Sequence, residues 1–73
     1  MIEVNLFATL RTGREKVYTL NADNIRTVKD IVSYLGIAPD DVAIILINGF
    51  HSNIEDPVED GAVVSLFPPV AGG

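Results

Sequence analysis

The residues of this chain that could take part in chemistry lie at its C-terminus, in the last seven residues, Phe67-Pro68-Pro69-Val70-Ala71-Gly72-Gly73. The two prolines have a fixed φ and lack a backbone N–H, so they end strand pairing and favour an extended exit. The two glycines have no side chain, so their backbone fits a slot too narrow for other residues. Fully extended, the segment can carry the terminal carboxylate roughly 20 Å from a folded domain. It therefore predicts that the α-carboxylate of Gly73 is the reactive group, presented to the active sites of other proteins.

The remaining side chains offer weak candidates for a site. The sequence has no cysteine and one histidine, His51, so a zinc-type ligand set is not expected. The acidic residues between positions 55 and 60 do not have the spacing of an EF-hand loop. No pairing of a nucleophile with a base is evident. We expect no bound metal or cofactor, a solvated acidic face, and a solvated loop position for His51.

Composition narrows the class of protein. The chain has 73 residues, of which 48% are hydrophobic, which predicts one folded domain. Its net charge of −5 disfavours nucleic-acid binding and favours partners that are basic around their docking sites. No run approaches the roughly 20 apolar residues of a membrane span, and the N-terminus lacks the features of a signal peptide. With no cysteine to form disulfides, we expect a cytoplasmic protein.

Hydrophobic periodicity predicts the elements that position the C-terminal segment. Residues 2–10 alternate polar and apolar, as in a half-buried strand, and residues 16–20 follow a glycine-containing turn as a second strand. The continuous apolar run 42–47 predicts a strand buried on both faces or nearly so. Asn48-Gly49 is a hairpin signal before a short strand over 50–54. A loop and the Asp60-Gly61 turn then lead into a last strand over 62–67.

One helix is expected between the second and third strands. Its apolar stripe has the spacing i, i+3, i+4, i+7 and consists of Val28, Ile31, Val32 and Leu35. Thr27 is a suitable N-cap, with Asp30 three residues later to complete a capping-box-like pair. Gly36 is placed for a left-handed C-cap, and Pro39 blocks continuation. A helix of about nine or ten residues is marginal alone, so its stripe must pack on the sheet.

This order of elements predicts an α+β roll over residues 1–67, followed by a tail over residues 68–73. We expect a mixed sheet of four to five strands, with the helix on one face and the first and last strands adjacent at its centre. The helix-facing residues would then be Ile2, Val4, Leu6, Ala8, Val64 and Leu66. Phe7 and Phe67 would share the opposite face. There they are either ordinary exposed residues or, with Arg11 nearby, a docking patch for a partner.

The sequence resembles a known family, the small ubiquitin-like sulfur carriers of the MoaD/ThiS type, over nearly its whole length. The resemblance is carried by four motifs: Leu6-Phe7-Ala8-Thr9-Leu10-Arg11, Ile47-Asn48-Gly49, Asp60-Gly61, and the Phe67 to Gly73 ending. The first and last are more similar to the molybdopterin branch than to the thiamine branch. The chain departs from the family in its short length for the molybdopterin branch and in Ala62, where a second acid is often found.

The resemblance implies the ubiquitin-like β-grasp fold and a carrier role. A ubiquitin-activating-type adenylyltransferase would use ATP to adenylate Gly73, and a persulfide donor protein would supply sulfur to form a thiocarboxylate. A larger molybdopterin synthase subunit, or an equivalent acceptor enzyme, would receive the tail and the sulfur. The chain itself would be a co-substrate, acting in a molybdopterin synthase as its non-catalytic small subunit. Pro68, Pro69, Val70, Ala71 and Gly72 would enter partner active sites, and Phe7, Phe67 and Arg11 would dock.

Three alternatives remain at this point. The sulfur could serve the thiamine pathway instead of a molybdenum or tungsten cofactor. Gly73 could be joined to lysines of target proteins, as ubiquitin is, because the same activated carboxylate would serve both reactions. The chain could also be a binding module in which the tail has no role.

Overall fold

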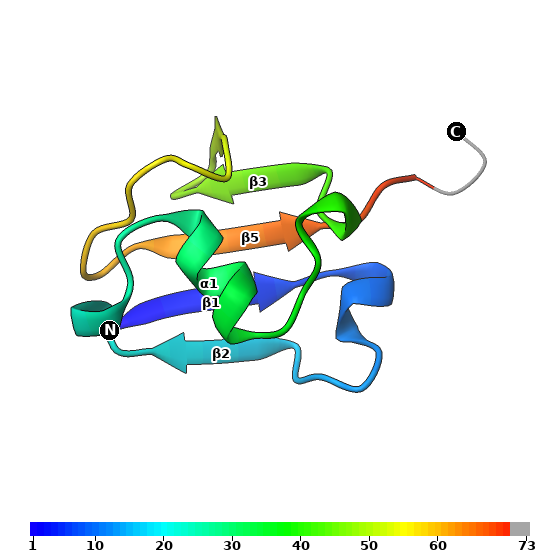
Figure 1. The fold of residues 1–73 in the computed structure, drawn as a ribbon, viewed down its shortest axis with the longest axis horizontal. Helices are drawn as coiled ribbons and strands as arrows, with labels where there is room; N and C mark the ends of the chain where they lie inside the picture. The colour runs from blue at the N-terminus through cyan, green and yellow to red at the C-terminus, as the bar shows by residue number, and fades with distance from the viewer. Residues whose placement is uncertain (71–73) are drawn as a thin grey trace.

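The computed structural model describes residues 1–70, and Ala71, Gly72 and Gly73 lie outside the described residues. Within the described part, five strands form one sheet, and one α-helix packs on one face of it (Figure 1). Three short 3-10 turns connect them. The elements are β1 (Ile2–Leu6), η1 (Ala8–Arg11), β2 (Val17–Leu20), η2 (Ala22–Asn24), α1 (Val28–Tyr34), η3 (Pro39–Asp41), β3 (Ile44–Ile47), β4 (Phe50–Ser52) and β5 (Val63–Phe67). This arrangement confirms the expected α+β roll.

The sheet is mixed, and the first and last strands of the sequence, β1 and β5, are neighbours at its centre. The strand order is β2-β1-β5-β3-β4, with β1 and β5 parallel and all other neighbours antiparallel. Val4 pairs with Val64 and Leu6 with Leu66, so equivalent side chains of the two strands point to the same face. The prediction that the first and last strands are central neighbours is confirmed.

The core lies between the sheet and α1. Ile2, Val4, Leu6, Val64 and Leu66 are completely buried and face the helix, as the alternation predicts. From the helix, Val28, Ile31 and Val32 are completely buried against them. Further buried residues close the ends of this layer: Leu10, Leu20, Ile25, Ile37, Ile45, Val58 and Ala62. Together they form one contiguous hydrophobic cluster.

Both ends of α1 are capped by side-chain and backbone hydrogen bonds. Thr27 is the N-cap, and the Asp30 carboxylate accepts from the backbone N–H groups of Arg26 at 2.9 Å and Thr27 at 3.1 Å. At the other end Gly36 has a φ of +70°. The N–H of Gly36 donates to the Ser33 carbonyl and that of Ile37 to the Val32 carbonyl, which is a Schellman cap. The Gly36 cap is where the sequence predicts it. The helix has seven residues, fewer than the roughly nine or ten expected, because Thr27 and Leu35 are its capping residues and lie outside the helix. No helix among residues 1–70 combines the length and apolar character needed to cross a membrane.

The first strand is shorter than its alternation predicts. β1 ends at Leu6, and Ala8 has a φ of +52°, which turns the chain into η1. As a result, the expectation that Ala8 faces the helix is wrong, and its side chain is exposed. Leu10 still reaches the core, with 4% of its surface exposed, but it does so from the turn. Residues 7–10 alternate polar and apolar as a strand would, but they form a turn.

Two expectations for the third and fourth strands are also wrong. Residues 44–47 are not buried on both faces, since Ile44 is 39% exposed and only Ile45 is buried. No described element covers the sheet face opposite α1, so a continuous apolar run here is compatible with one open face (Figure 1). β4 ends at Ser52, because the N–H of Asn53 donates to the Asp56 carboxylate. His51 is exposed, as expected, but it belongs to β4 and not to a loop.

The two hydrogen bonds to Asp30 predict a pH-dependent contribution of this residue to stability. They lower the pKa of Asp30 below its ordinary value of 3.8, because they stabilise the ionised form. A lowered folded-state pKa gives stability that is present above the ordinary pKa and is lost as the pH falls through the folded value.

We therefore expect Asp30→Asn to melt at a lower temperature than the parent chain at about pH 7, with the difference shrinking as the pH falls below the ordinary pKa of 3.8. The measurement is the difference in Tm between the two proteins across this range. The asparagine keeps one oxygen acceptor at the same place, so the comparison isolates the charge. A Tm difference independent of pH would contradict the assignment.

Candidate functional site

Phe7, Phe67 and Arg11 meet on the sheet face opposite α1. The two phenyl rings are stacked, with centroids 4.4 Å apart and planes inclined by 8°. The Arg11 guanidinium carbon lies 5.2 Å from the centroid of the Phe7 ring, within the range of a cation–π contact. Both phenylalanines are only half-buried. The residues that the sequence suggested as a docking patch therefore form one cluster, which we call the Phe7–Phe67 patch.

The central pair of strands positions this patch. Leu6, the last residue of β1, is the register partner of Leu66 in parallel β5, so the next residues, Phe7 and Phe67, lie side by side. The Phe7 N–H donates to the Leu66 carbonyl at 3.2 Å, and Arg11 Nε donates to the Leu6 carbonyl at 2.7 Å. A stacked aromatic pair of this kind contributes about 0.5–1.5 kcal/mol beyond its buried area. The rings are thus held before any partner arrives.

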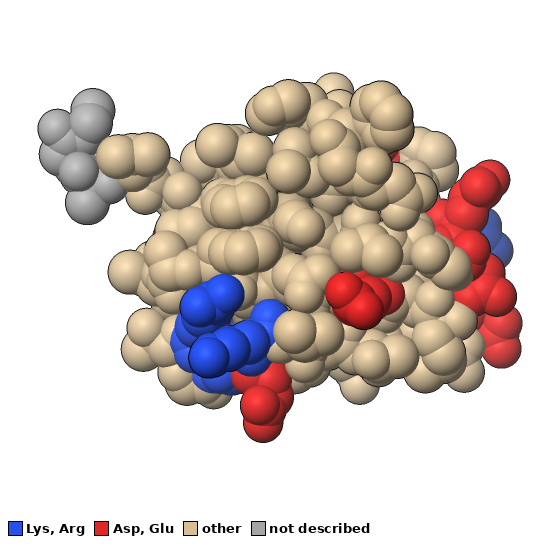
Figure 2. Space-filling model, turned by 180° about the vertical axis from the view of Figure 1, so that it is seen from behind, with Lys and Arg blue, Asp and Glu red and all other residues tan. Residues whose placement is uncertain are grey.

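The patch continues into apolar side chains of the open sheet face. Ile44 and Val63 are 39% and 38% exposed, and Ile44 is the register partner of Phe67. Figure 2 shows that most of this face carries no charge. Sequence analysis did not assign Ile44 and Val63 to a docking site. The period of two in β5 could have found Val63, because it lies four residues before Phe67.

Charges are unevenly distributed around this face. Three of the five basic residues, Arg11, Arg14 and Lys16, fall within six consecutive positions. Figure 2 shows a Lys/Arg cluster at the end of the face from which the tail leaves, and acidic residues mainly at the opposite end. Net charge alone does not describe this surface, because the basic and acidic side chains gather mainly at opposite ends of the face (Figure 2). The basic end of the face is complementary to acidic groups, whereas the net charge of −5 is complementary to basic ones.

The tail begins directly at the patch. The Ala43 N–H donates to the Phe67 carbonyl at 2.8 Å, and Pro68, which has no N–H, ends the ladder on the following residue. Pro68 is half-buried, whereas Val70 is 79% exposed. A hollow of about 280 Å³ lies at the base of the tail, lined by Thr9, Leu10, Arg14, Asp41, Pro68 and Pro69. Ala71, Gly72 and Gly73, assigned to the tail from sequence, lie outside the described residues.

Arg14 fixes this end of the domain in a way that the sequence did not reveal. Its guanidinium donates to the carbonyls of Leu10, Leu35 and Gly36, at 3.3, 3.4 and 3.2 Å. It therefore ties η1 to the C-terminal end of α1, where free carbonyls attract a positive charge. An arginine at the end of a turn gives no sequence signal for such a contact, since Leu35 and Gly36 are more than 20 positions away.

The acidic loop has contacts of its own. Asp60 is hydrogen-bonded to the Met1 ammonium group, which lowers the pKa of Asp60. Asp56 accepts from the Asn53 N–H at 2.8 Å. Among residues 1–70 no group of three or more histidine, cysteine, aspartate or glutamate side chains is arranged to hold a metal ion. The residues whose placement suggests chemistry are those at the exit of the tail.

Comparison with known proteins agrees with this architecture. The model of the ThiS family matches residues 4–73. No curated protein sequence matches the chain.

Several solved structures share the fold. SAMP1 from Haloferax volcanii has a TM-score of 0.73 and 27% identity, over 99% of this chain and 98% of that chain. A structure of H. volcanii small archaeal modifier protein 1 has a TM-score of 0.73 and 26% identity, over 94% and 97%. A complex of subunits 1 and 2 of the molybdopterin-converting factor from Helicobacter pylori contains a chain with a TM-score of 0.64 and 26% identity, over 99% and 97%.

The backbone at Ala8, which carries the turn after Phe7, predicts a stabilising substitution. A φ of +52° is unfavourable for a residue with a Cβ by about 1–2 kcal/mol, whereas glycine adopts it readily. We expect Ala8→Gly to raise the free energy of unfolding by about 1 kcal/mol, measured by urea denaturation.

Ala38→Gly is the matched control, because Ala38 is also exposed but has an ordinary φ of −68°. It should lower stability by about 0.4–1 kcal/mol through the entropy of the unfolded chain. If the two substitutions lowered stability equally, Ala8 would not be strained.

Proposed function

The chain belongs to the ThiS family, and from that premise we propose that it is a sulfur carrier whose Gly73 carboxylate becomes a thiocarboxylate. The observation that carries the proposal is the exit of the tail. β5 runs without interruption into Pro68 and Pro69, and a preformed aromatic patch lies beside that exit. A partner can therefore bind the domain at the patch while the tail enters the active site of that partner. We propose residues 1–67 as the domain and 68–73 as the tail.

The chemistry begins with activation, because a carboxylate is a poor electrophile. In the proposed first step, an oxygen of the Gly73 carboxylate attacks the α-phosphorus of ATP bound to an adenylyltransferase, and pyrophosphate leaves. A persulfide of a donor protein then attacks the acyl carbon of the adenylate, and AMP leaves. A second thiol of the donor attacks the resulting acyl disulfide. This releases the Gly73 thiocarboxylate and leaves a disulfide on the donor, so the electrons balance.

The tail sequence suits passage through several active sites. Glycines at the last two positions add no side chain, and recognition of a C-terminal carboxylate by backbone N–H groups is a recurring binding mode. Val70 is 79% exposed and follows a half-buried Pro68. Pro69 and Val70 are both exposed, so this part of the tail is available to a partner channel. In this proposal the domain binds no cofactor, and ATP is consumed by the adenylyltransferase.

We propose the molybdopterin pathway as the destination of the sulfur, in the cytoplasm. The support is the similarity to a chain from the molybdopterin-converting factor of H. pylori, which was solved as a complex of its two subunits. The acceptor would then be a larger synthase subunit, and the chain would be its non-catalytic small subunit. Transfer in the thiamine pathway is the alternative within this chemistry.

A second candidate function is protein modification through Gly73. Its support is the similarity to small archaeal modifier protein 1. The two functions share the adenylate, so they differ only in whether a persulfide or a lysine amine attacks it. Conjugates linked to lysine in cells would favour modification.

The proposal predicts that Gly73 is essential for activation and dispensable for folding. We expect incubation with a matched adenylyltransferase, ATP and a persulfide donor to raise the intact mass by about 16 Da, as sulfur replaces oxygen. Gly73→Ala and deletion of Gly73 should abolish this gain while leaving the Tm unchanged. Equal thiocarboxylate yield from either variant would contradict the proposal.

If the Phe7–Phe67 patch is the docking surface, a substitution in it should weaken binding to the adenylyltransferase without changing the chemical step. We expect Phe7→Ala to raise the KM for adenylation at least about tenfold with little change in kcat, because uniform binding is lost. Phe50→Ala is the control, since Phe50 is an aromatic residue of β4 that is 76% exposed and lies outside the patch. A variant of Phe7 with unchanged KM would remove the patch from the docking surface.

A further inference from the structure

The edge of the sheet formed by β2 has unpaired backbone groups. β2 is the first strand in the order and has a single neighbour, β1. The Leu6 N–H donates to the Lys16 carbonyl at 2.9 Å, so Lys16 is a hydrogen-bonded partner of β1. Hydrogen-bonded positions alternate along an antiparallel strand, which gives Tyr18 and Leu20 the same role. Val17 and Thr19 therefore direct their N–H and C=O groups away from the sheet.

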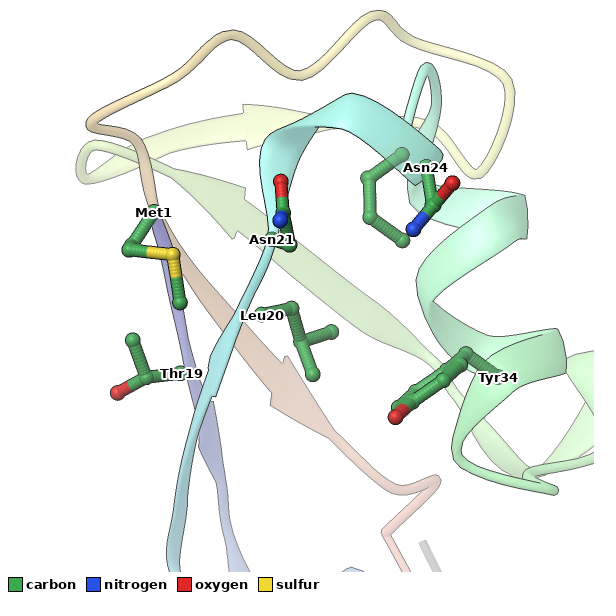
Figure 3. A pocket seen from close by; sticks show the side chains of 7 residues that line it. Met1, Thr19, Leu20, Asn21, Asn24 and Tyr34 are labelled. Atoms are coloured by element: carbon green, nitrogen blue, oxygen red, sulfur yellow. The ribbon is translucent and has the colours of Figure 1, made fainter.

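A cavity lies beside the end of this strand, on the helix side of the sheet. It has a volume of about 260 Å³ and is lined by Met1, Thr19, Leu20, Asn21, Asn24, Ile25 and Tyr34. Leu20 and Ile25 are buried and provide apolar surface, while Asn21, Asn24 and the 71%-exposed Tyr34 provide polar groups. In Figure 3 the Tyr34 side chain extends from α1 toward β2, and Leu20 lies between the two elements.

We propose that this edge binds an extended segment of a partner protein. The segment pairs antiparallel with β2, places an aliphatic side chain in the cavity and places an acidic side chain beside Lys16. Addition of a strand to a free sheet edge, with a pocket for an alternate side chain, is an established mode of peptide recognition. The proposal goes beyond the sulfur-carrier function and does not depend on Gly73.

The register of β2 fixes the sequence pattern of the segment. Val17 and Thr19 supply the backbone hydrogen bonds, and the residues opposite Lys16, Tyr18 and Leu20 point to the helix side. The cavity lies beside Leu20 on that side. The aliphatic residue of the segment must then stand opposite Leu20, and the acidic residue opposite Lys16. These two residues are four positions apart, about 13 Å along the strand.

The positive charge of Lys16 is the reason to expect an acidic residue in the bound segment. Lys16 is exposed, and no carboxylate within residues 1–70 lies at ion-pair distance from it. The neighbouring Arg14 is engaged with three backbone carbonyls. A carboxylate on the segment would gain from both positive charges. Because β1 separates β2 from β5, where the tail begins, a bound segment and a docked tail are compatible.

The test uses the full chain and the synthetic peptide acetyl-Ile-Thr-Val-Thr-Glu-amide. Its isoleucine stands opposite Leu20 and its glutamate opposite Lys16. We expect the peptide to shift the backbone amide NMR signals of Val17, Thr19, Leu20 and Asn24 in a saturable manner. A peptide with glycine in place of isoleucine should bind at least about tenfold more weakly, because the cavity is then left unfilled.

Two matched pairs of measurements test the geometry. Thr19→Pro removes an outward N–H that β1 does not use and should weaken binding at least about tenfold, whereas Thr19→Val, which keeps that N–H, should not. Lys16→Glu should weaken binding of the same peptide and restore it for a peptide ending in lysine. This charge exchange keeps the test valid if the proline variant does not fold.

Three outcomes would overturn the proposal. The first is the absence of any amide shift at millimolar peptide. The second is a set of shifts centred on the Phe7–Phe67 patch. The third is a concentration-dependent dimer joined through β2, which would make a second copy of the chain the occupant. None of these outcomes bears on thiocarboxylate formation, so failure here is distinguishable from failure of the carrier function.

Discussion

The parallel pairing of β1 and β5 is the contact on which the rest of the structure depends. It joins the two ends of the sequence at the centre of the sheet, and it buries Val4, Leu6, Val64 and Leu66 under the helix. Because the two strands run in the same direction, both finish at the same end of the sheet. Phe7 directly follows β1 and Phe67 is the last residue of β5, so the patch and the tail arise together from one register.

A domain of this size can cover only one face of its sheet. A chain of this length buries about 60% of the surface that it exposes when unfolded. The single helix supplies a core on one side, and the opposite face keeps partly exposed apolar side chains such as Ile44 and Val63. Such a face is suited to contact with other proteins. The small size of the domain and the presence of a docking surface therefore have a common physical origin.

One of the two non-glycine residues with a positive φ within residues 1–70 lies where the patch is built. Ala8 takes a left-handed conformation immediately after Phe7, and Arg14 ties the same turn to the end of α1. The first feature costs stability, and the second supplies hydrogen bonds to the Leu35 and Gly36 carbonyls, which accept neither of the two hydrogen bonds of the Schellman cap. Together they hold η1 against the exit of the tail, so that Arg11 stays over the Phe7 ring. The turn thus links the stability of the domain to the shape of its docking surface.

The sequence alone determined the elements with a strong local signal. The alternation of β1 and β5, the apolar stripe of α1 with its Thr27 and Gly36 caps, and the hairpin at Asn48-Gly49 follow from side-chain period and turn chemistry. The Pro-Pro-Val-Ala-Gly-Gly ending pointed to the chemistry proposed for Gly73. Only the tertiary structure decided where β1 stops, that residues 44–47 have an open face, how Phe7 and Phe67 stack, and which carbonyls Arg14 contacts. These features depend on residues distant in sequence that a shared register brings together, and local pattern carries no information about that register.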